Sequence, residues 1–135
     1  PLAIVASGWR TELIFEGIEP YVSTMVGRWF KPGEAINGTA GWFLDDDADA
    51  VEVRLFWFTS GKGTRDVEVV GRFHIGQPER NGNRSFSFQV PAGPYSFSGA
   101  LITLTWAIEL VALPSGETER LDLVIGPRPV EVELA

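Results

Sequence analysis

Closely spaced carboxylates between residues 45 and 49 are the first candidates for chemistry in this sequence. The run Asp45-Asp46-Asp47-Ala48-Asp49 places acids at alternate positions, as the start of an EF-hand calcium loop does. The pattern then fails, because Ala50 stands where the loop needs glycine and Phe56 where it needs the closing glutamate. We expect a solvated hairpin tip that discourages edge pairing. Calcium binding by Asp45, Asp47 and Asp49 in another geometry is the alternative.

His74 limits the catalytic possibilities because it is the only histidine, and cysteine is absent. A site with several histidines or thiolates is thereby excluded within one chain, and any Ser-His-Asp triad must pass through His74. Its apolar neighbours Phe73 and Ile75 lie on the opposite strand face, as is typical of a surface or half-buried histidine. No Gly-x-Ser-x-Gly elbow occurs, and Ser60-Gly61-Lys62-Gly63 is too short for a phosphate-binding loop. We expect no enzyme, no cofactor and no metal.

Five tryptophans are many for a chain of 135 residues. Trp57 and Trp106 belong to alternating apolar faces and are expected in the core, where large aromatic side chains anchor the packing. Trp9, Trp29 and Trp42 stand near expected turns, and exposed aromatics at such places can stack on sugar rings. A carbohydrate-binding module is therefore an alternative function, although no acidic or amide residue is visibly interleaved with these three tryptophans.

Charge and composition narrow the class of protein. Eleven basic against 18 acidic residues give a net charge of −7, which opposes binding to nucleic acid or to anionic lipid. No apolar run of about 18 residues occurs, so a membrane would be reached only through a segment outside this chain. The chain begins at Pro1 with a small apolar segment, which is typical of a cut end after a signal or membrane segment. A cytoplasmic protein and the soluble domain of a membrane-anchored protein both stay open.

Frequent turn residues between β-prone segments predict an all-β fold in one domain, residues 1–135. Glycine occurs 15 times and proline 9 times, and no apolar period of 3.6 residues persists for a dozen residues. Nine strands are too many for one flat sheet, so we expect two packed antiparallel sheets. The expected strands are Glu12–Phe15, Val22–Trp29, Ala35–Phe43, Val51–Thr59, Asp66–Ile75, Arg84–Val90, Leu101–Val111, Leu121–Ile125 and Val130–Leu134.

Two-residue alternation assigns the inward faces of these strands. In 51–58, Phe56 and Phe58 fall on the face opposite Val51, Val53 and Leu55, which predicts a partly covered outer face there. The inward side chains expected from the two clearest alternations are Phe86, Phe88, Val90, Ile102, Leu104, Trp106, Ile108 and Leu110.

The sequence pattern also predicts two hairpin turns and one edge strand. Ser60-Gly61-Lys62-Gly63 and Asn81-Gly82-Asn83 are expected as hairpin turns. Pro127 and Pro129 precede the alternating acidic and aliphatic residues Val130, Glu131, Val132, Glu133 and Leu134, which is typical of a protected edge strand. This segment is the candidate for partner binding by strand addition.

Two stretches of the chain resemble the arrestin-like branch of immunoglobulin-type domains. One is Phe30-Lys31-Pro32-Gly33-Glu34-Ala35-Ile36-Asn37-Gly38, which is similar to the family's aromatic-x-Pro-Gly-Glu turn and the strand after it. The other is Phe86-Ser87-Phe88-Gln89-Val90-Pro91, followed by Pro94-Tyr95-Ser96-Phe97 and by Ile102-x-Leu104-x-Trp106. Both occur in the family's order, and the resemblance covers about residues 22–126.

The resemblance implies an arrestin-like, immunoglobulin-like β-sandwich of the single-domain bacterial type. Eukaryotic arrestins carry two such domains and a phosphate-sensing polar core, whereas this chain has room for one domain and offers no residues to match that core. What the family implies is a non-catalytic protein-binding or structural module. A small sandwich fills its interior with side chains, so we expect a protein partner, self or other, at a sheet edge or on an outer face. A calcium-dependent adhesion-type domain is a further alternative.

Overall fold

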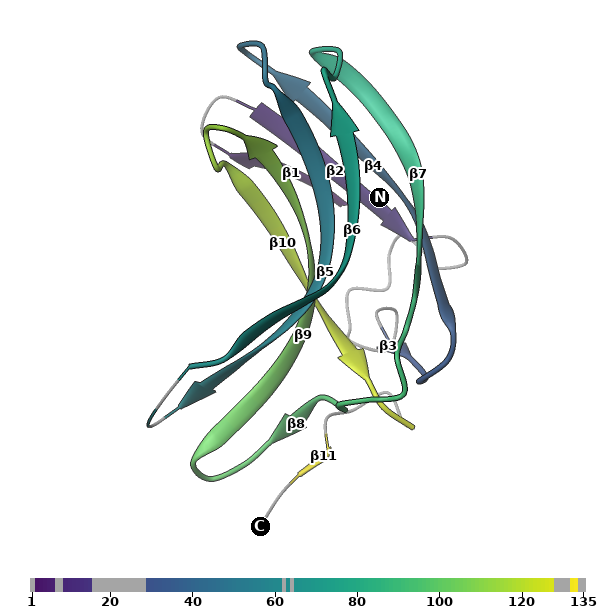
Figure 1. Cartoon of the computed structure of the whole chain (residues 1–135), viewed down its shortest axis with the longest axis vertical. Helices are drawn as coiled ribbons and strands as arrows, with labels where there is room; N and C mark the ends of the chain where they lie inside the picture. Colours follow the sequence, from purple (N-terminus) through teal and green to yellow (C-terminus); the bar gives the residue numbers. More distant parts are fainter. Residues whose placement is uncertain are drawn as a thin grey trace.

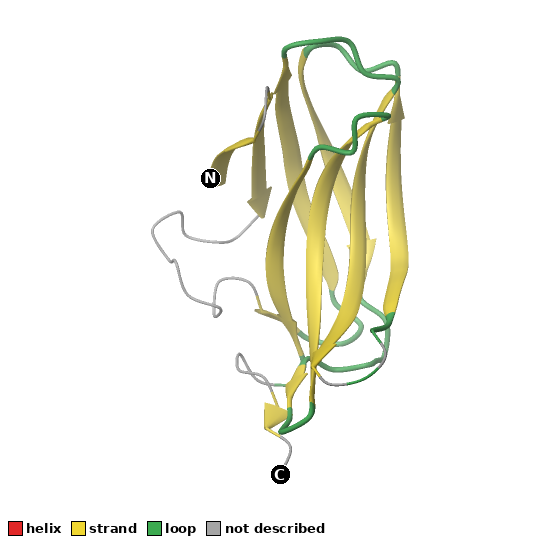
Figure 2. Cartoon of the chain, turned by 90° about the vertical axis from the view of Figure 1, so that its left-hand side faces the viewer, coloured by secondary structure: helices red, strands yellow, loops and turns green. Residues whose placement is uncertain are grey.

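The computed structural model describes residues 2–6, 9–15, 29–61, 63, 65–127 and 132–133, and gives backbone only for residues up to 15 and for 132–133. Every regular element in these residues is a β-strand, as Figure 2 shows, so the all-β expectation is confirmed for this part of the chain. A helix long and apolar enough to cross a membrane does not occur among the same residues.

The smaller sheet contains four strands, β1 (Leu2–Ala6), β2 (Trp9–Phe15), β4 (Ala35–Leu44) and β7 (Asn81–Gln89). They pair in the order β1-β2-β4-β7, and every pairing is antiparallel. Strand β4 is central, because β2 and β7 flank it over almost its whole length (Figure 1).

The larger sheet contains seven strands, β3 (Trp29–Phe30), β5 (Ala50–Gly61), β6 (Val67–Gly76), β8 (Phe97–Ser98), β9 (Ile102–Leu113), β10 (Thr118–Ile125) and β11 (Val132–Glu133). One edge of β9 pairs with β5 along its full length, and β5 pairs in turn with β6. The other edge of β9 is shared by β10 and β8, which extend the sheet through parallel pairs with β3 and β11 respectively.

One hydrophobic core lies between the two sheets. Its buried side chains come from β4 and β7 on one side and from β5, β6, β9 and β10 on the other. Alternation explains the membership, since every second residue of each strand points the same way. The largest completely buried members are Trp42, Trp106, Ile36, Leu55, Ile108, Leu110, Leu123 and Ile125.

The alternating faces expected from the sequence are confirmed with one exception. Phe86, Phe88, Leu104 and Trp106 are buried as expected, together with Val90, Ile108 and Leu110. Ile102, however, is 41% exposed. It pairs with Gly61 at the very end of the β5–β9 ladder, where its inward direction meets little of the smaller sheet.

Two of the expected hairpins are instead crossovers between the sheets. The acidic run 45–49 links β4 of the smaller sheet to β5 of the larger one, so it is not the tip of a hairpin. Residues 81–83 lie inside β7, and the turn before them is at 77–80, where Gln77 takes a positive φ of 51°. Consecutive strands β5 and β6 are paired, so a hairpin does connect them, but Ser60 and Gly61 lie inside β5, where a Cβ at Gly61 would overlap the carbonyl oxygen of Leu101.

The strand predictions differ from the structure mainly at the ends of the chain. Strands β1 and β8 were not predicted, because a five-residue apolar run and a two-residue pair are too short for periodicity to identify. Of the expected strand 22–29, only Trp29 is described, and it begins β3. In the expected strand Val130–Leu134, only residues 132–133 are described.

Candidate functional site

The Pro32–Gly33 turn forms as the sequence predicts. Glu34 donates its backbone N–H to the carbonyl of Lys31 at 3.1 Å, and Gly33 takes a φ of +87°. Proline followed by a glycine at positive φ is the pattern of a type II turn. Gly33 N–H in turn donates to Val90 at 3.0 Å, and Val90 N–H donates to Glu34 at 2.8 Å. The two stretches that carry the family resemblance therefore contact each other directly.

The second stretch of the family resemblance, which contains Pro94 and Ser96, is held to the larger sheet by hydrogen bonds between buried or partly buried groups. Ser96 donates its backbone N–H to Ile125 at 2.8 Å, and its Oγ accepts the N–H of Ile125 at 3.0 Å. Trp106 Nε1 donates to the carbonyl of Pro94 at 2.8 Å. These donors and acceptors satisfy one another. These hydrogen bonds therefore stabilise the fold at this end of the molecule, and the polar groups that make them are not available to a ligand.

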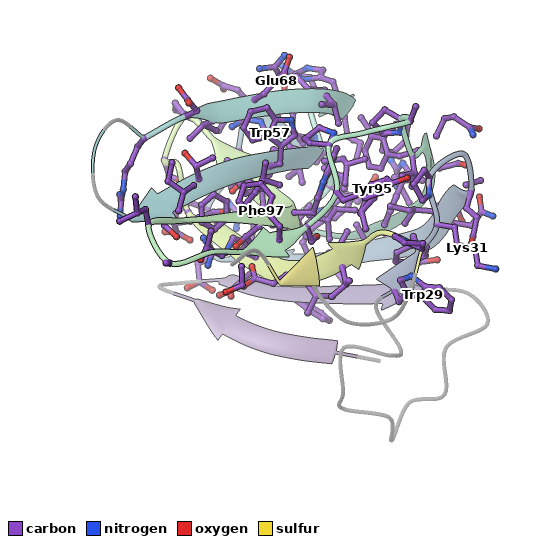
Figure 3. All side chains as sticks on the ribbon, turned by 90° about the horizontal axis from the view of Figure 1, so that it is seen from below. Trp29, Lys31, Trp57, Glu68, Tyr95 and Phe97 are labelled. Carbon is purple, nitrogen blue, oxygen red and sulfur yellow. The ribbon has the colours of Figure 1, made fainter. Side chains whose placement is uncertain are left out.

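The tryptophans expected near turns do not form an exposed platform. Trp42 was expected at a turn but is buried in the core, where its Nε1 donates to the carbonyl of Glu79 at 2.8 Å. Trp29 is half-buried, donates to Gly126 at 2.9 Å and lies 5.4 Å from the Lys31 ammonium. Figure 3 shows Trp29 and Lys31 together, away from Trp57. The side chain of Trp9 lies outside the described residues.

Trp57 faces inward, as predicted, but it is only partly buried. It packs against the core cluster and is the cross-strand partner of Glu68, and Figure 3 shows the two side chains near each other. Its buried Nε1 has no hydrogen-bond acceptor among the described residues.

A row of charged side chains crosses the outer face of the larger sheet. His74 Nδ1 lies 2.7 Å from Glu52, Arg54 Nε lies 2.9 Å from the same carboxylate, and Arg54 also contacts Glu109 at 3.7 Å. Glu109 accepts a hydrogen bond from Thr118 at 3.2 Å. Each partner lies on a neighbouring strand or two residues along the same one, so alternation aligns them on one face.

Glu52 is the electrostatic centre of this row. The hydrogen bond from His74 lowers the pKa of Glu52 below its ordinary value of 4.5, partial burial opposes the change, and Arg54 lowers the pKa further. Because an ionised carboxylate only accepts hydrogen bonds, His74 Nδ1 carries the proton. His74 itself is 58% exposed, as the sequence predicts. Among the described residues, no serine or threonine hydroxyl donates to it, so the third group of a triad is not seen there.

Beside the charged row, the same outer face is hollowed over two phenylalanines. Phe56 and Phe58 stack with ring centroids 6.0 Å apart, and the Arg120 guanidinium lies 4.8 Å from the centre of the Phe58 ring. The hollow has a volume of about 580 Å³. We call it the outer-face groove, and its main lining residues are Phe56, Phe58, Arg65, Val67, Glu109 and Arg120.

The groove confirms one prediction and adds residues that the sequence did not indicate. Phe56 is only 8% exposed although it faces outward and lies outside the core cluster, which agrees with a partly covered outer face. Arg65 and Arg120 were not singled out. Arg120 lies some 60 positions from Phe58, and only the pairing of β10 with β9 and of β9 with β5 brings them together. Two outward phenylalanines were the signal that could have located the groove.

The acidic run 45–49 does not gather its carboxylates around one point. Asp47 accepts a hydrogen bond from Arg80 Nε at 2.8 Å, and the backbone of Asp49 is bonded to Leu113 and Gln77, both at 2.9 Å. In the part of the chain that the structure describes, no three acidic or histidine side chains come close enough together to hold a metal ion. Calcium binding by Asp45, Asp47 and Asp49 in another geometry stays the alternative prediction.

Two strands of the larger sheet are candidates for pairing with a strand of another chain. Strand β11 is the last in its strand order and pairs with β8, but Val130, Glu131 and Leu134 of the expected edge segment lie outside the described residues. Strand β6 is ten residues long and, within the described chain, pairs only with β5. On β6, Val67 is 65% exposed and Val70 is also exposed.

Comparison with known proteins supports the fold. No protein family and no curated protein matches the sequence. The structure is similar to that of Spo0M, a sporulation control protein from Bacillus subtilis, with a TM-score of 0.57 and 15% identity over 92% of this chain and 51% of that one. This chain therefore spans about half the length of Spo0M. At this identity the likeness concerns the fold alone, and it agrees with an arrestin-like architecture in its coarse form.

Weaker similarities carry no argument about function. A β-glucosidase from Listeria innocua has a TM-score of 0.45 and 10% identity over 90% of this chain and 16% of that one. The alkylpurine DNA glycosylase AlkC of Pseudomonas fluorescens has a TM-score of 0.44 and 10% identity over 89% of this chain and 31% of that one.

Proposed function

We propose that this chain is a non-catalytic protein-binding module built as a two-sheet, arrestin-like sandwich. The observation that carries the proposal is the edge of β6 that pairs with no described strand, ten residues long with Val67 and Val70 exposed. Unpaired backbone N–H and C=O groups on such an edge accept a strand from another chain, and exposed aliphatic side chains add contact area. The fold shared with a protein described as a sporulation control protein is compatible with this role.

The hydrogen-bonded residues at the Pro32–Gly33 end support the absence of catalysis. Their donors and acceptors are used within the chain, and the His74–Glu52 pair faces solvent rather than a deep cleft. General acid–base catalysis needs a substrate held within hydrogen-bond reach of such a pair. The exposure of His74 on the sheet face supports a non-catalytic module.

The test compares two double variants that add the same charge at exposed positions. Val67→Lys with Val70→Lys charges the β6 edge, whereas Tyr95→Lys with Leu101→Lys charges exposed positions away from it. Cross-linking in the source cells followed by quantitative mass spectrometry measures the partners, and sedimentation velocity measures self-association. We expect the amount of a cross-linked partner, or the degree of self-association, to fall at least tenfold with the β6 variant and to stay unchanged with the control.

A monomeric chain whose cross-linked partners are the same for both variants would refute binding through β6. The same assay on a chain lacking residues 130–135 tests the C-terminal edge that the sequence indicated. Melting curves of each variant establish that the fold is intact.

A further inference from the structure

The outer-face groove combines an aromatic floor with arginine groups that have hydrogen-bond donors to spare. Arg120 uses its Nε to contact Asp122 at 3.0 Å and lays its guanidinium over Phe58. No acceptor for its two terminal nitrogens is found among the described residues. Arg65, which lines the same groove at the β5–β6 turn, makes no ion pair within the described chain. Donors and an apolar floor therefore lie within one hollow.

The single carboxylate in the groove does not cancel this positive character. Glu109 contacts Arg54 at 3.7 Å, accepts the hydroxyl of Thr118 at 3.2 Å and is the cross-strand partner of Arg120, so it offsets only one of the two positive charges of the lining. The remaining arginine donors face a hollow of about 580 Å³. Two arginines against one carboxylate make the lining of this hollow more basic than the chain as a whole, whose net charge is −7.

We propose that the outer-face groove binds an acidic peptide segment of a partner protein, in which carboxylates flank an aliphatic or aromatic side chain. The apolar side chain would contact Phe56 and Phe58, and the carboxylates would accept hydrogen bonds from Arg65 and Arg120. Arginine binds carboxylates with charge-assisted and often bidentate hydrogen bonds, which are stronger than neutral ones.

This inference rests on the proposed function, since it names the chemistry of one partner segment. It uses a different surface from the β6 edge, although Val67 belongs to both. Variants at Arg65 and Arg120 therefore test the groove, and they leave the exposed valines of the edge unchanged.

The experiment begins with a selection. A phage-displayed library of random peptides, about a dozen residues long, is selected on the full chain, and enriched peptides are synthesised with a fluorescent label. Fluorescence polarisation then measures their affinity for the parent chain and for variants. We expect enriched peptides with two or more Asp or Glu beside Leu or Phe. Arg65→Glu and Arg120→Glu should each weaken their binding at least tenfold, and Arg65→Gln and Arg120→Gln should weaken it less.

Arg72→Glu is the matched control. Arg72 lies on the same outer face, opposite Arg54 in the β5–β6 ladder, but does not line the groove, so affinity should stay within about twofold. Enrichment of basic or neutral peptides, no enrichment at all, or equal binding to the parent and the Arg65 and Arg120 variants would overturn the proposal. A dimer in sedimentation that is lost with Arg120→Glu would instead identify a second copy as the occupant. None of these results would affect binding through the β6 edge.

Discussion

Strand β5 presents two unlike faces. Val51, Val53 and Leu55 point into the core and are completely or almost completely buried. Glu52, Arg54, Phe56 and Phe58 alternate with them on the outside and form a charged row and an aromatic floor. Packing against the smaller sheet accounts for the inner residues. No described strand covers the outer residues, and their arrangement of phenylalanine beside arginine is not needed to close the core.

Burial on the two faces of β5 has different causes. Inside, apolar side chains from both sheets cover one another and gain the free energy of leaving water. Outside, Phe56 is covered by side chains of its own sheet, with Arg120 lying over Phe58. Removing an inner side chain should therefore leave a cavity, whereas removing an outer one should mainly change a surface.

The largest expected effect is that of Trp106→Ala. Trp106 is completely buried and also donates to Pro94, so its loss leaves a cavity and an unsatisfied carbonyl. We expect a loss of about 3–5 kcal/mol in the free energy of unfolding. Urea unfolding of the parent, of Trp106→Ala and of the outer-face variant Phe58→Ala measures the contrast. Phe58→Ala should lose only about 1 kcal/mol, since its ring is half-buried. Equal losses would contradict the assignment of the two faces.

A smaller effect is expected from a polar group on the buried side. Ser96 Oγ accepts the backbone N–H of Ile125 at 3.0 Å, and Ser96 is almost completely buried. Ser96→Ala leaves that N–H without an acceptor, which should cost about 1–3 kcal/mol. Ser98→Ala, two residues further on and only partly buried, should change the free energy of unfolding by less than about 0.5 kcal/mol. Thermal and urea unfolding distinguish the two, and similar values would mean that Ser96 is not an essential acceptor.

The outer face should respond to pH where the inner face does not. Because the folded chain lowers the pKa of Glu52 below 4.5, the ionised carboxylate stabilises the fold above that pH, and this contribution disappears as the pH falls through the lowered pKa. Glu52→Gln should therefore be less stable than the parent at pH 7, with a difference that becomes smaller as the pH falls below 4.5.

Melting temperatures measured from pH 7 to pH 3 test the Glu52 prediction. Glu68→Gln is the control, since Glu68 is exposed and makes no ion pair in the described residues. A difference between parent and Glu52→Gln that is constant over the whole range would mean that the His74 and Arg54 contacts do not stabilise the ionised form.

The same contrast explains how much the sequence could predict. Alternation located the inner faces of β7 and β9 because a buried face demands apolar residues at every second position. It did not reveal that residues 45–49 and 77–80 cross between sheets, because a local pattern does not state which strand is the neighbour. The Pro32–Gly33 turn was predictable from two residues.

The candidate site was less predictable for a related reason. The outward phenylalanines of β5 could be identified, but Arg65 and Arg120 come from distant parts of the chain and meet them only through pairing. The prediction that Trp42 stands near a turn is wrong, because Trp42 alternates with the buried residues Ile36 and Ala40 on the inward face of β4.

The smallest expected effect lies at the acidic crossover, which belongs to neither face. Replacing Asp45, Asp46, Asp47 and Asp49 together by asparagine removes four like charges that repel one another, and among the described residues only Asp47 of these four makes an ion pair, with Arg80. Both side chains of that ion pair are exposed, and exposed ion pairs contribute little to the free energy of unfolding. The melting temperature should therefore change by no more than a degree or two, with or without millimolar calcium. Differential scanning calorimetry with calcium or with a chelator measures this, and the Arg80→Gln variant separates the ion pair from the repulsion. A melting temperature of the parent that rises with calcium, and no longer rises in the asparagine variant, would establish a cation site at the crossover. Such a result would also show that the carboxylates of residues 45–49 move on binding calcium, since in the structure they do not converge on a common point.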